Sequence, residues 1–187
     1  MTRLRPVLAA LPLLVLALAA CSASPSGSQG ESAEPTAAAT AEATADAATV
    51  LDECAGVAVI VDSGDLEVPE PIDLAACVDT DGPILAADAL DEAGVTTEGT
   101  DEWGDQVVCR VNGEPAESTL ITAADGTEYH ETCASMPAAF AYWALWQRTA
   151  GGEWAYAQEG LPTLELQPGD AVELLFTLND APASPAE

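Results

Sequence analysis

The segment from Phe140 to Phe176 constrains the fold of this chain most strongly, because apolar runs and turn residues alternate along it. The runs predict four strands, at Phe140–Thr149, Glu153–Gln158, Thr163–Gln167 and Ala171–Leu178. The intervening residues, Ala150-Gly151-Gly152, Glu159-Gly160-Leu161-Pro162 and Pro168-Gly169, are of the kinds that form turns. We therefore expect a strand-rich domain whose sheet is built largely from this segment.

Alternation within these strands predicts which side chains share a face. On the last strand, Val172, Leu174, Phe176 and Leu178 line one face. The first strand is apolar on both faces, with Tyr142, Ala144 and Trp146 on one and Trp143 and Leu145 on the other. A strand covered on both faces is central in its sheet, or one of its faces is a binding surface. Both interpretations stay open.

The upstream half contributes further strands and one helix. Gly56–Asp62 predicts a buried strand, and Val95–Thr97 and Gln106–Asn112 predict two more. Between Thr80 and Val95 the pattern predicts a helix, capped by Thr80 or Asp81 and ended at Gly94. Its apolar face comprises Ala86, Ala89, Leu90 and Ala93. Leu120–Thr132 is ambiguous, with Asp125-Gly126 marking a hairpin. One helix among about seven strands makes the expected fold class α+β.

Four cysteines, Cys54, Cys77, Cys109 and Cys133, lie within the expected folded domain. In an exported domain four cysteines form two disulfides, and three connectivities are available. We predict the bonds Cys54–Cys77 and Cys109–Cys133, which join sequence neighbours. The alternative of free or metal-binding thiols lacks a CxxC pair or a histidine cluster, so we predict no metal site.

The N-terminus reads as a targeting segment. Residues 1–20 combine a short positive start with an apolar run, as in a secretory signal peptide. Leu18-Ala19-Ala20-Cys21 resembles the lipobox of bacterial lipoproteins. That resemblance implies lipidation of Cys21 and anchoring at the outer face of the cytoplasmic membrane, facing the cell wall. An ordinary secreted protein is the alternative.

Composition divides the remaining chain. Residues 21–50 are rich in Ala, Ser and Thr without an aromatic residue, which predicts a disordered linker between the lipid anchor and the domain. The domain is expected at residues 51–180, followed by a polar tail at 181–187.

The charge of the chain excludes one class of partner. The sequence has 32 acidic and 4 basic residues and a net charge of -28. Such a balance repels nucleic acid and keeps copies of the chain apart, so we expect a monomer that binds no nucleic acid. Solubility alone also accounts for it.

No catalytic constellation is recognisable, and we expect a protein that is not an enzyme. His130 is the only histidine and no nucleophile elbow accompanies it. Asp79-Thr80-Asp81-Gly82 resembles the start of a calcium loop but lacks the closing glutamate. Aromatic residues are unusually dense, and they supply the candidate ligand-binding residues Tyr142, Trp143, Trp146, Trp154 and Tyr156. A core role for these side chains is the alternative.

The same residues carry a family likeness. AYWALWQRTAGGEWAYAQEG, followed by LQPGDAVELLF, resembles the transcobalamin C-terminal-like domain of bacterial surface proteins, in an actinobacterial branch. Val108–Gly113 and Leu90–Gly94 also fit it. The resemblance implies a β-grasp-like mixed sheet and a non-catalytic module without a cofactor. Its ligand would be a soluble small molecule, such as cobalamin or another corrinoid, taken up through an importer. The chain lacks the helical barrel of the cobalamin carriers. An envelope or adhesion module that binds a surface protein through the same aromatic residues is the alternative.

Overall fold

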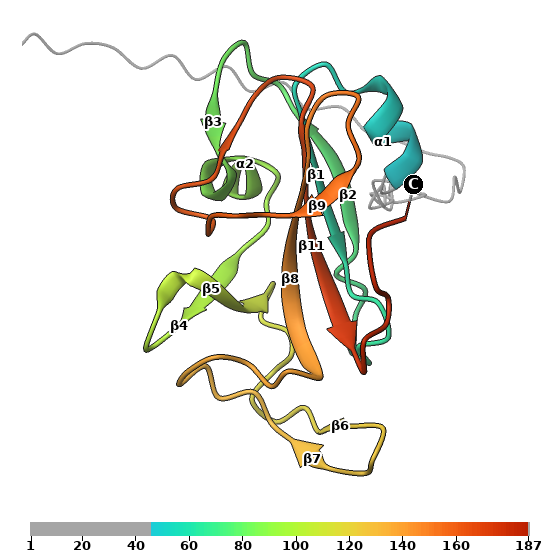
Figure 1. Ribbon diagram of the computed structural model, residues 1–187, viewed down its shortest axis with the longest axis vertical. Helices are drawn as coiled ribbons and strands as arrows, with labels where there is room; N and C mark the ends of the chain where they lie inside the picture. The colour runs from blue at the N-terminus through green and yellow to red at the C-terminus, as the bar shows by residue number, and fades with distance from the viewer. Residues whose placement is uncertain (1–45, 187) are drawn as a thin grey trace, which may run out of the picture. The chain divides into compact units, whose positions relative to one another are not determined.

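The computed structural model describes residues 46–186, which form a mixed α+β domain (Figure 1). The expectations for the signal peptide, for Cys21 and for the linker up to residue 45 lie outside these residues. The elements are α1 (Ala47–Glu53), β1 (Val57–Asp62), β2 (Leu74–Val78), β3 (Ile84–Leu85), α2 (Ala86–Glu92), β4 (Thr97–Thr100), β5 (Gly104–Val111), β6 (Ile121–Thr122), β7 (Glu128–Tyr129), β8 (Ala141–Arg148), β9 (Trp154–Tyr156), β10 (Glu165–Leu166) and β11 (Ala171–Leu178).

A five-stranded mixed sheet, ordered β2-β1-β11-β8-β9, forms the centre of the domain. β1 and β11 pair in parallel, while β2, β8 and β9 join by antiparallel pairing. Because β11 lies between β1 and β8, its residues Ala171 to Thr177 are all buried. Gly169 has φ +92°, the conformation that the predicted Pro168-Gly169 turn requires of a glycine.

The main core lies on one face of this sheet. Val57, Val59 and Val61 of β1 meet Val172, Leu174 and Phe176 of β11 there. Helix α2 packs on the same core through Ala86, Ala89 and Leu90, as its apolar periodicity predicted.

Helix α2 begins later than predicted. Its first residue is Ala86 and its N-cap is Leu85, so the expected caps Thr80 and Asp81 do not cap it. The preceding β3 pairs with β10 in a separate two-stranded sheet, and that pairing holds the backbone extended. The Thr80 hydroxyl instead donates to the carbonyl of Gly82, 2.8 Å away, within a local turn. The strand predicted at Thr163–Gln167 forms as β10, but it lies outside the five-stranded sheet that contains β8, β9 and β11.

A second helix, α1, covers part of the opposite sheet face. Asp46 caps it by accepting hydrogen bonds from the backbone N–H groups of Ala48 and Thr49. Val50 of α1 is buried against Ala58, Ile60, Ala75 and Ala171. The sequence predicted one helix; α1 was missed because only one of its seven residues is buried. It begins four residues before the expected domain boundary at residue 51.

Both predicted disulfides are present. Cys54–Cys77 ties the end of α1 to β2, and Cys109–Cys133 ties β5 to the segment after β7. The hairpin expected at Asp125-Gly126 also forms, as the antiparallel pair β6–β7. Strand β2 was not predicted, and β4 begins two residues later than the strand expected at Val95–Thr97.

Candidate functional site

The pairing of β8 with β9 brings four of the five candidate aromatic residues onto one sheet face. Tyr156 lies opposite Trp146, and Trp154 lies opposite Arg148. Tyr142 precedes Trp146 by four residues on β8 and therefore shares its face. We call Tyr142, Trp146, Trp154 and Tyr156 the aromatic surface. The face is the one that α1 also covers, further along the sheet.

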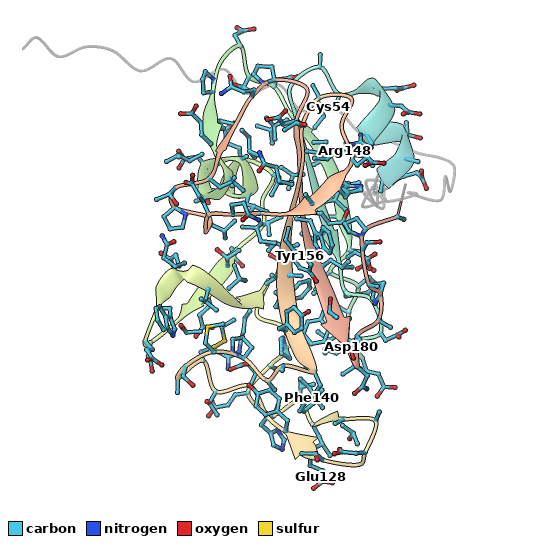
Figure 2. The ribbon with its side chains drawn as sticks, viewed as in Figure 1. Cys54, Glu128, Phe140, Arg148, Tyr156 and Asp180 are labelled. Carbon is cyan, nitrogen blue, oxygen red and sulfur yellow. A yellow bond between two sulfur atoms is a disulfide. The ribbon has the colours of Figure 1, made fainter. Side chains whose placement is uncertain are left out.

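The rings of the aromatic surface are held in place by one another and by α1. Trp146 and Tyr156 stack with their centroids 3.9 Å apart. Trp146 is the buried ring of this pair, while 48% of Tyr156 is exposed. The Arg148 guanidinium lies 5.5 Å from the ring centroid of Trp154 and donates to the carbonyl of Leu51 in α1. Figure 2 shows Arg148 beside α1 and Tyr156 farther down the sheet. Trp146 and Tyr156 therefore form a stacked pair whose outer ring, that of Tyr156, is exposed.

Trp143, the fifth candidate, lies on the opposite face and belongs to the main core. Its ring meets that of Phe176 edge to face, with centroids 5.2 Å apart. Its indole N–H donates to the carbonyl of Glu114 at 2.9 Å. Trp143 is 6% exposed, so its energetic role is packing.

A hollow of about 350 Å³ opens at the edge of β8 beside the aromatic surface. β9 pairs with β8 only over Trp146–Arg148, so within residues 46–186 the stretch Ala141–Ala144 has no partner strand on that side. One wall of the hollow comes from β5. The other wall is the chain after β9, which packs so closely that a Cβ on Gly160 would lie 2.8 Å from Gln106 Cα. The lining includes Gln106, Val108, Tyr142, Leu145, Tyr156 and Leu161.

Two indole N–H groups of the aromatic surface have no hydrogen-bond acceptor among the described residues. They belong to Trp146 and Trp154, and both nitrogen atoms are buried. A buried donor without an acceptor costs about 1–3 kcal/mol. Tyr142 and burial raise the pKa of Tyr156, and Asp180 adds to the effect. The site thus combines ring faces, hydroxyl groups and unmatched donors.

Glu173 of β11 is a functional candidate that sequence reasoning missed. Its neighbours across the sheet are Ile60 on β1 and Trp146 on β8. It is only 2% exposed, and burial together with Asp62 raises the pKa of Glu173 to about 8. A lone carboxyl between Ala171 and Leu175, on a strand apolar on both faces, was the signal that could have revealed it.

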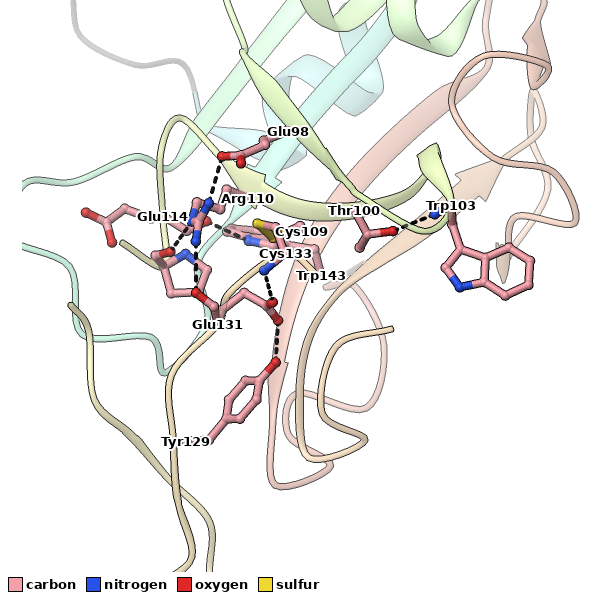
Figure 3. The surroundings of a disulfide bond; sticks show 11 residues. Glu98, Thr100, Trp103, Cys109, Arg110, Glu114, Tyr129, Glu131, Cys133 and Trp143 are labelled. Carbon is pink, nitrogen blue, oxygen red and sulfur yellow. Dashed lines mark hydrogen bonds and ion pairs between the residues drawn. A yellow bond between two sulfur atoms is a disulfide. The ribbon is translucent and has the colours of Figure 1, made fainter. Parts of the chain in front are cut away.

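The surroundings of the Cys109–Cys133 disulfide form a structural network (Figure 3). Arg110 donates to Glu98, to the carbonyl of Pro115 and to the carbonyl of Glu131. The buried Glu131 carboxylate accepts from the backbone N–H of Cys133 at 2.7 Å and from the Tyr129 hydroxyl at 2.6 Å. Burial and Glu131 raise the pKa of Tyr129 to about 12. These contacts hold the β4–β7 region together internally, and the Trp143 indole that donates to the carbonyl of Glu114 links this region to β8.

The one convergence of metal-ligand types among residues 46–186 is Cys109, Glu131 and Cys133. The two sulfur atoms are bonded to each other and both Glu131 oxygens accept hydrogen bonds, so we assign no metal to this group. The side chain of His130 is exposed.

Within residues 46–186 no helix has the length and apolar character that a membrane crossing requires. Comparison of the chain with family models, with curated proteins and with solved structures finds no match. The arguments for function therefore come from the site and from the sequence resemblance.

Proposed function

We propose that the domain is a non-catalytic module that binds a soluble small ligand on the aromatic surface. The observation that carries the proposal is the half-exposed Tyr156 ring, stacked on the buried Trp146 beside a hollow. The hollow's volume of about 350 Å³ lies within the usual range of small-molecule sites, about 300–1,000 Å³. Exposed aromatic rings in a fixed position lose little conformational entropy on binding and favour flat apolar ligands.

A corrinoid is the ligand class that we propose to test first. It offers a broad planar face for Tyr156 and amide side arms that would meet the hydroxyl groups of Tyr142 and Tyr156. A corrin ring is larger than the hollow and would lie across the aromatic surface, with one side arm entering the hollow. The β-grasp-like architecture belongs to the same proposal, supported by a mixed sheet with α2 packed against one face.

The setting of this module is also proposed. A lipid on Cys21 would hold the domain at the outer face of the cytoplasmic membrane, where it would pass its ligand to an importer. The LAAC sequence after an apolar run supports the lipid, and the two disulfides support an oxidising compartment.

Isothermal titration of the full-length chain with cyanocobalamin and with cobinamide tests the ligand. We expect a dissociation constant in the micromolar range or tighter. Tyr156→Ala should weaken binding about two- to thirteenfold, because ring stacking contributes about 0.5–1.5 kcal/mol. Trp103→Ala is the matched control, since Trp103 is 52% exposed on the β4–β5 turn, outside the site. Absence of heat with both compounds would reject the corrinoid, and equal binding by Tyr156→Ala would reject the surface.

One observation favours the alternative, a module that binds an envelope or adhesion protein. The free edge of β8 from Ala141 to Ala144 offers backbone groups to which an extended segment of a partner could add as a strand. A Trp143→Pro substitution on that edge would not distinguish the two functions, because Trp143 is core. Retention of an envelope protein by the wild-type chain, weakened in Tyr156→Ala and without a corrinoid response, would favour this alternative.

A further inference from the structure

A cavity beneath α1 lies on the sheet face that also carries the aromatic surface. It supports an inference that does not depend on that surface. Its volume is about 170 Å³, and its walls come from α1, β1, β11 and the C-terminal segment. Taking about 30 Å³ per water in the liquid, it holds the volume of roughly five or six heavy atoms. The lining comprises Asp46, Ala47, Ala48, Leu51, Ile60, Asp62, Glu173 and Ala186.

Glu173, which lines this cavity, is only 2% exposed. No hydrogen bond within residues 46–186 contributes to its pKa, and the one charge that acts on it is that of Asp62, which has the same sign. A buried carboxylate without a partner is costly, and an ammonium ion placed against it would offset that cost.

The chain cannot supply this cation from its own described residues. It has no lysine. Arg110 is held by Glu98 and two carbonyl groups, and Arg148 is held by Leu51 and the Trp154 ring. Arg3 and Arg5 fall in the expected signal peptide, and the exposed His130 follows β7, at the end of the domain away from α1 (Figure 1).

The geometry points to a small organic cation and away from a metal ion. The oxygen atoms of Asp46, Asp62 and Glu173 do not converge as metal ligands do. Asp46 and Asp62 each use one oxygen to accept backbone hydrogen bonds, and they place negative charge around the cavity. Between the charges, Leu51 and Ile60 offer apolar contact.

We propose that this cavity binds a primary alkylammonium ion, with its ammonium group against the Glu173 carboxylate and its alkyl stem against Leu51 and Ile60. A four-carbon amine has five heavy atoms and matches the cavity volume. The aromatic surface takes no part in this site, so a negative corrinoid titration would leave the proposal standing.

Thermal unfolding of the full-length chain in a non-ionic detergent at pH 8.5 tests the proposal. Butylammonium chloride replaces sodium chloride at constant ionic strength, because any cation screens the self-repulsion of a chain with net charge -28. We expect the midpoint to rise with butylammonium concentration and to stay constant with the uncharged butanol. Calcium chloride at matched ionic strength should produce no comparable rise, and an equal rise would overturn the proposal.

Variants locate the site. Glu173→Gln should weaken the butylammonium response at least tenfold, whereas Glu128→Gln, which removes an exposed carboxyl from β7, should leave it unchanged. Ala47→Leu keeps every charge and enlarges a half-buried side chain that lines the cavity, so it should also weaken the response, while Tyr156→Ala should not. An undiminished response in either Glu173→Gln or Ala47→Leu would overturn the proposal.

Discussion

Glu173 places a buried carboxyl group in the middle of the sheet, at an energetic cost that depends on pH. Burial raises its pKa from 4.5 in a model peptide to about 8 in the folded domain. Between these two values the folded state keeps a proton that the unfolded chain has released. The contribution of Glu173 to stability is therefore fully present below about pH 4.5 and is lost as the pH rises towards 8.

Glu173→Gln should remove this pH dependence, because an amide does not ionise. Relative to wild type, the variant's free energy of unfolding should rise between pH 5 and pH 8.5 by roughly 3 to 5 kcal/mol. Urea unfolding at several pH values measures the difference. Glu128→Gln removes the same charge from an exposed position and should run parallel to wild type. Parallel curves for Glu173→Gln as well would show that its pKa is not raised.

The sheet depends on a close backbone approach between the start of β1 and the end of β2. A Cβ on Gly56 would collide with the carbonyl oxygen of Val78, which is fixed by the β1–β2 pairing. Gly56 also accepts a hydrogen bond from the backbone N–H of Gly169 at 2.6 Å, which aligns the start of β11. One small residue therefore positions three strands.

Gly56→Ala should accordingly lower the free energy of unfolding by about 2 kcal/mol or more, because backbone atoms must shift. Gly82→Ala is the matched control: nothing lies within 4 Å of its Cβ position, and its φ is ordinary for an L-residue. That change should leave stability equal or raise it by about 0.4–1 kcal/mol. Chemical denaturation of both variants checks the contrast, and equal effects would contradict it.

At the scale of these elements, the sequence predicted well wherever a pattern was local. Strands β8 and β11 were predicted within a residue or so because their alternation and flanking turns are strong. The face of α2 followed from Ala86, Ala89 and Leu90, whereas its start did not, because the β3–β10 pairing involves residues about 80 positions apart.

The candidate site was predicted in part. Tyr142, Trp146, Trp154 and Tyr156 do share a face, which the alternation of β8 and a short β8–β9 connection favour. The separation of Trp143 into the core followed from the same alternation, but which face would be buried depended on the placement of the main core. Glu173 lines a cavity beneath α1, a helix that the composition did not reveal.

In the whole molecule, the two disulfides hold different parts of the domain. Cys54–Cys77 joins α1 to the sheet, and Cys109–Cys133 closes a loop of 24 residues that contains β6 and β7. The Arg110 network ties segments of the same region to one another by side-chain contacts. Neither the Cys109–Cys133 disulfide nor the Arg110 network includes a residue of the five-stranded sheet.

Replacing Cys109 and Cys133 together by serine should lower the free energy of unfolding by about 3 kcal/mol on the loop-entropy model. Hydrogen exchange should accelerate over β4–β7 while β1 and β11 keep their relative protection. The pair Cys54→Ser and Cys77→Ser should have a similar energetic effect but accelerate exchange in α1 and β2 instead. The same exchange pattern in both double variants would contradict this division.

The parallel pairing of β1 with β11 has a consequence for the order in which the chain becomes folded. The first long strand of the sheet acquires its central neighbour only after residues 171–178 have been synthesised, more than a hundred residues later. In a growing chain Val57–Asp62 can pair with β2 early, but it lacks its parallel partner β11 throughout most of synthesis. The sheet therefore closes only once the last strand has emerged.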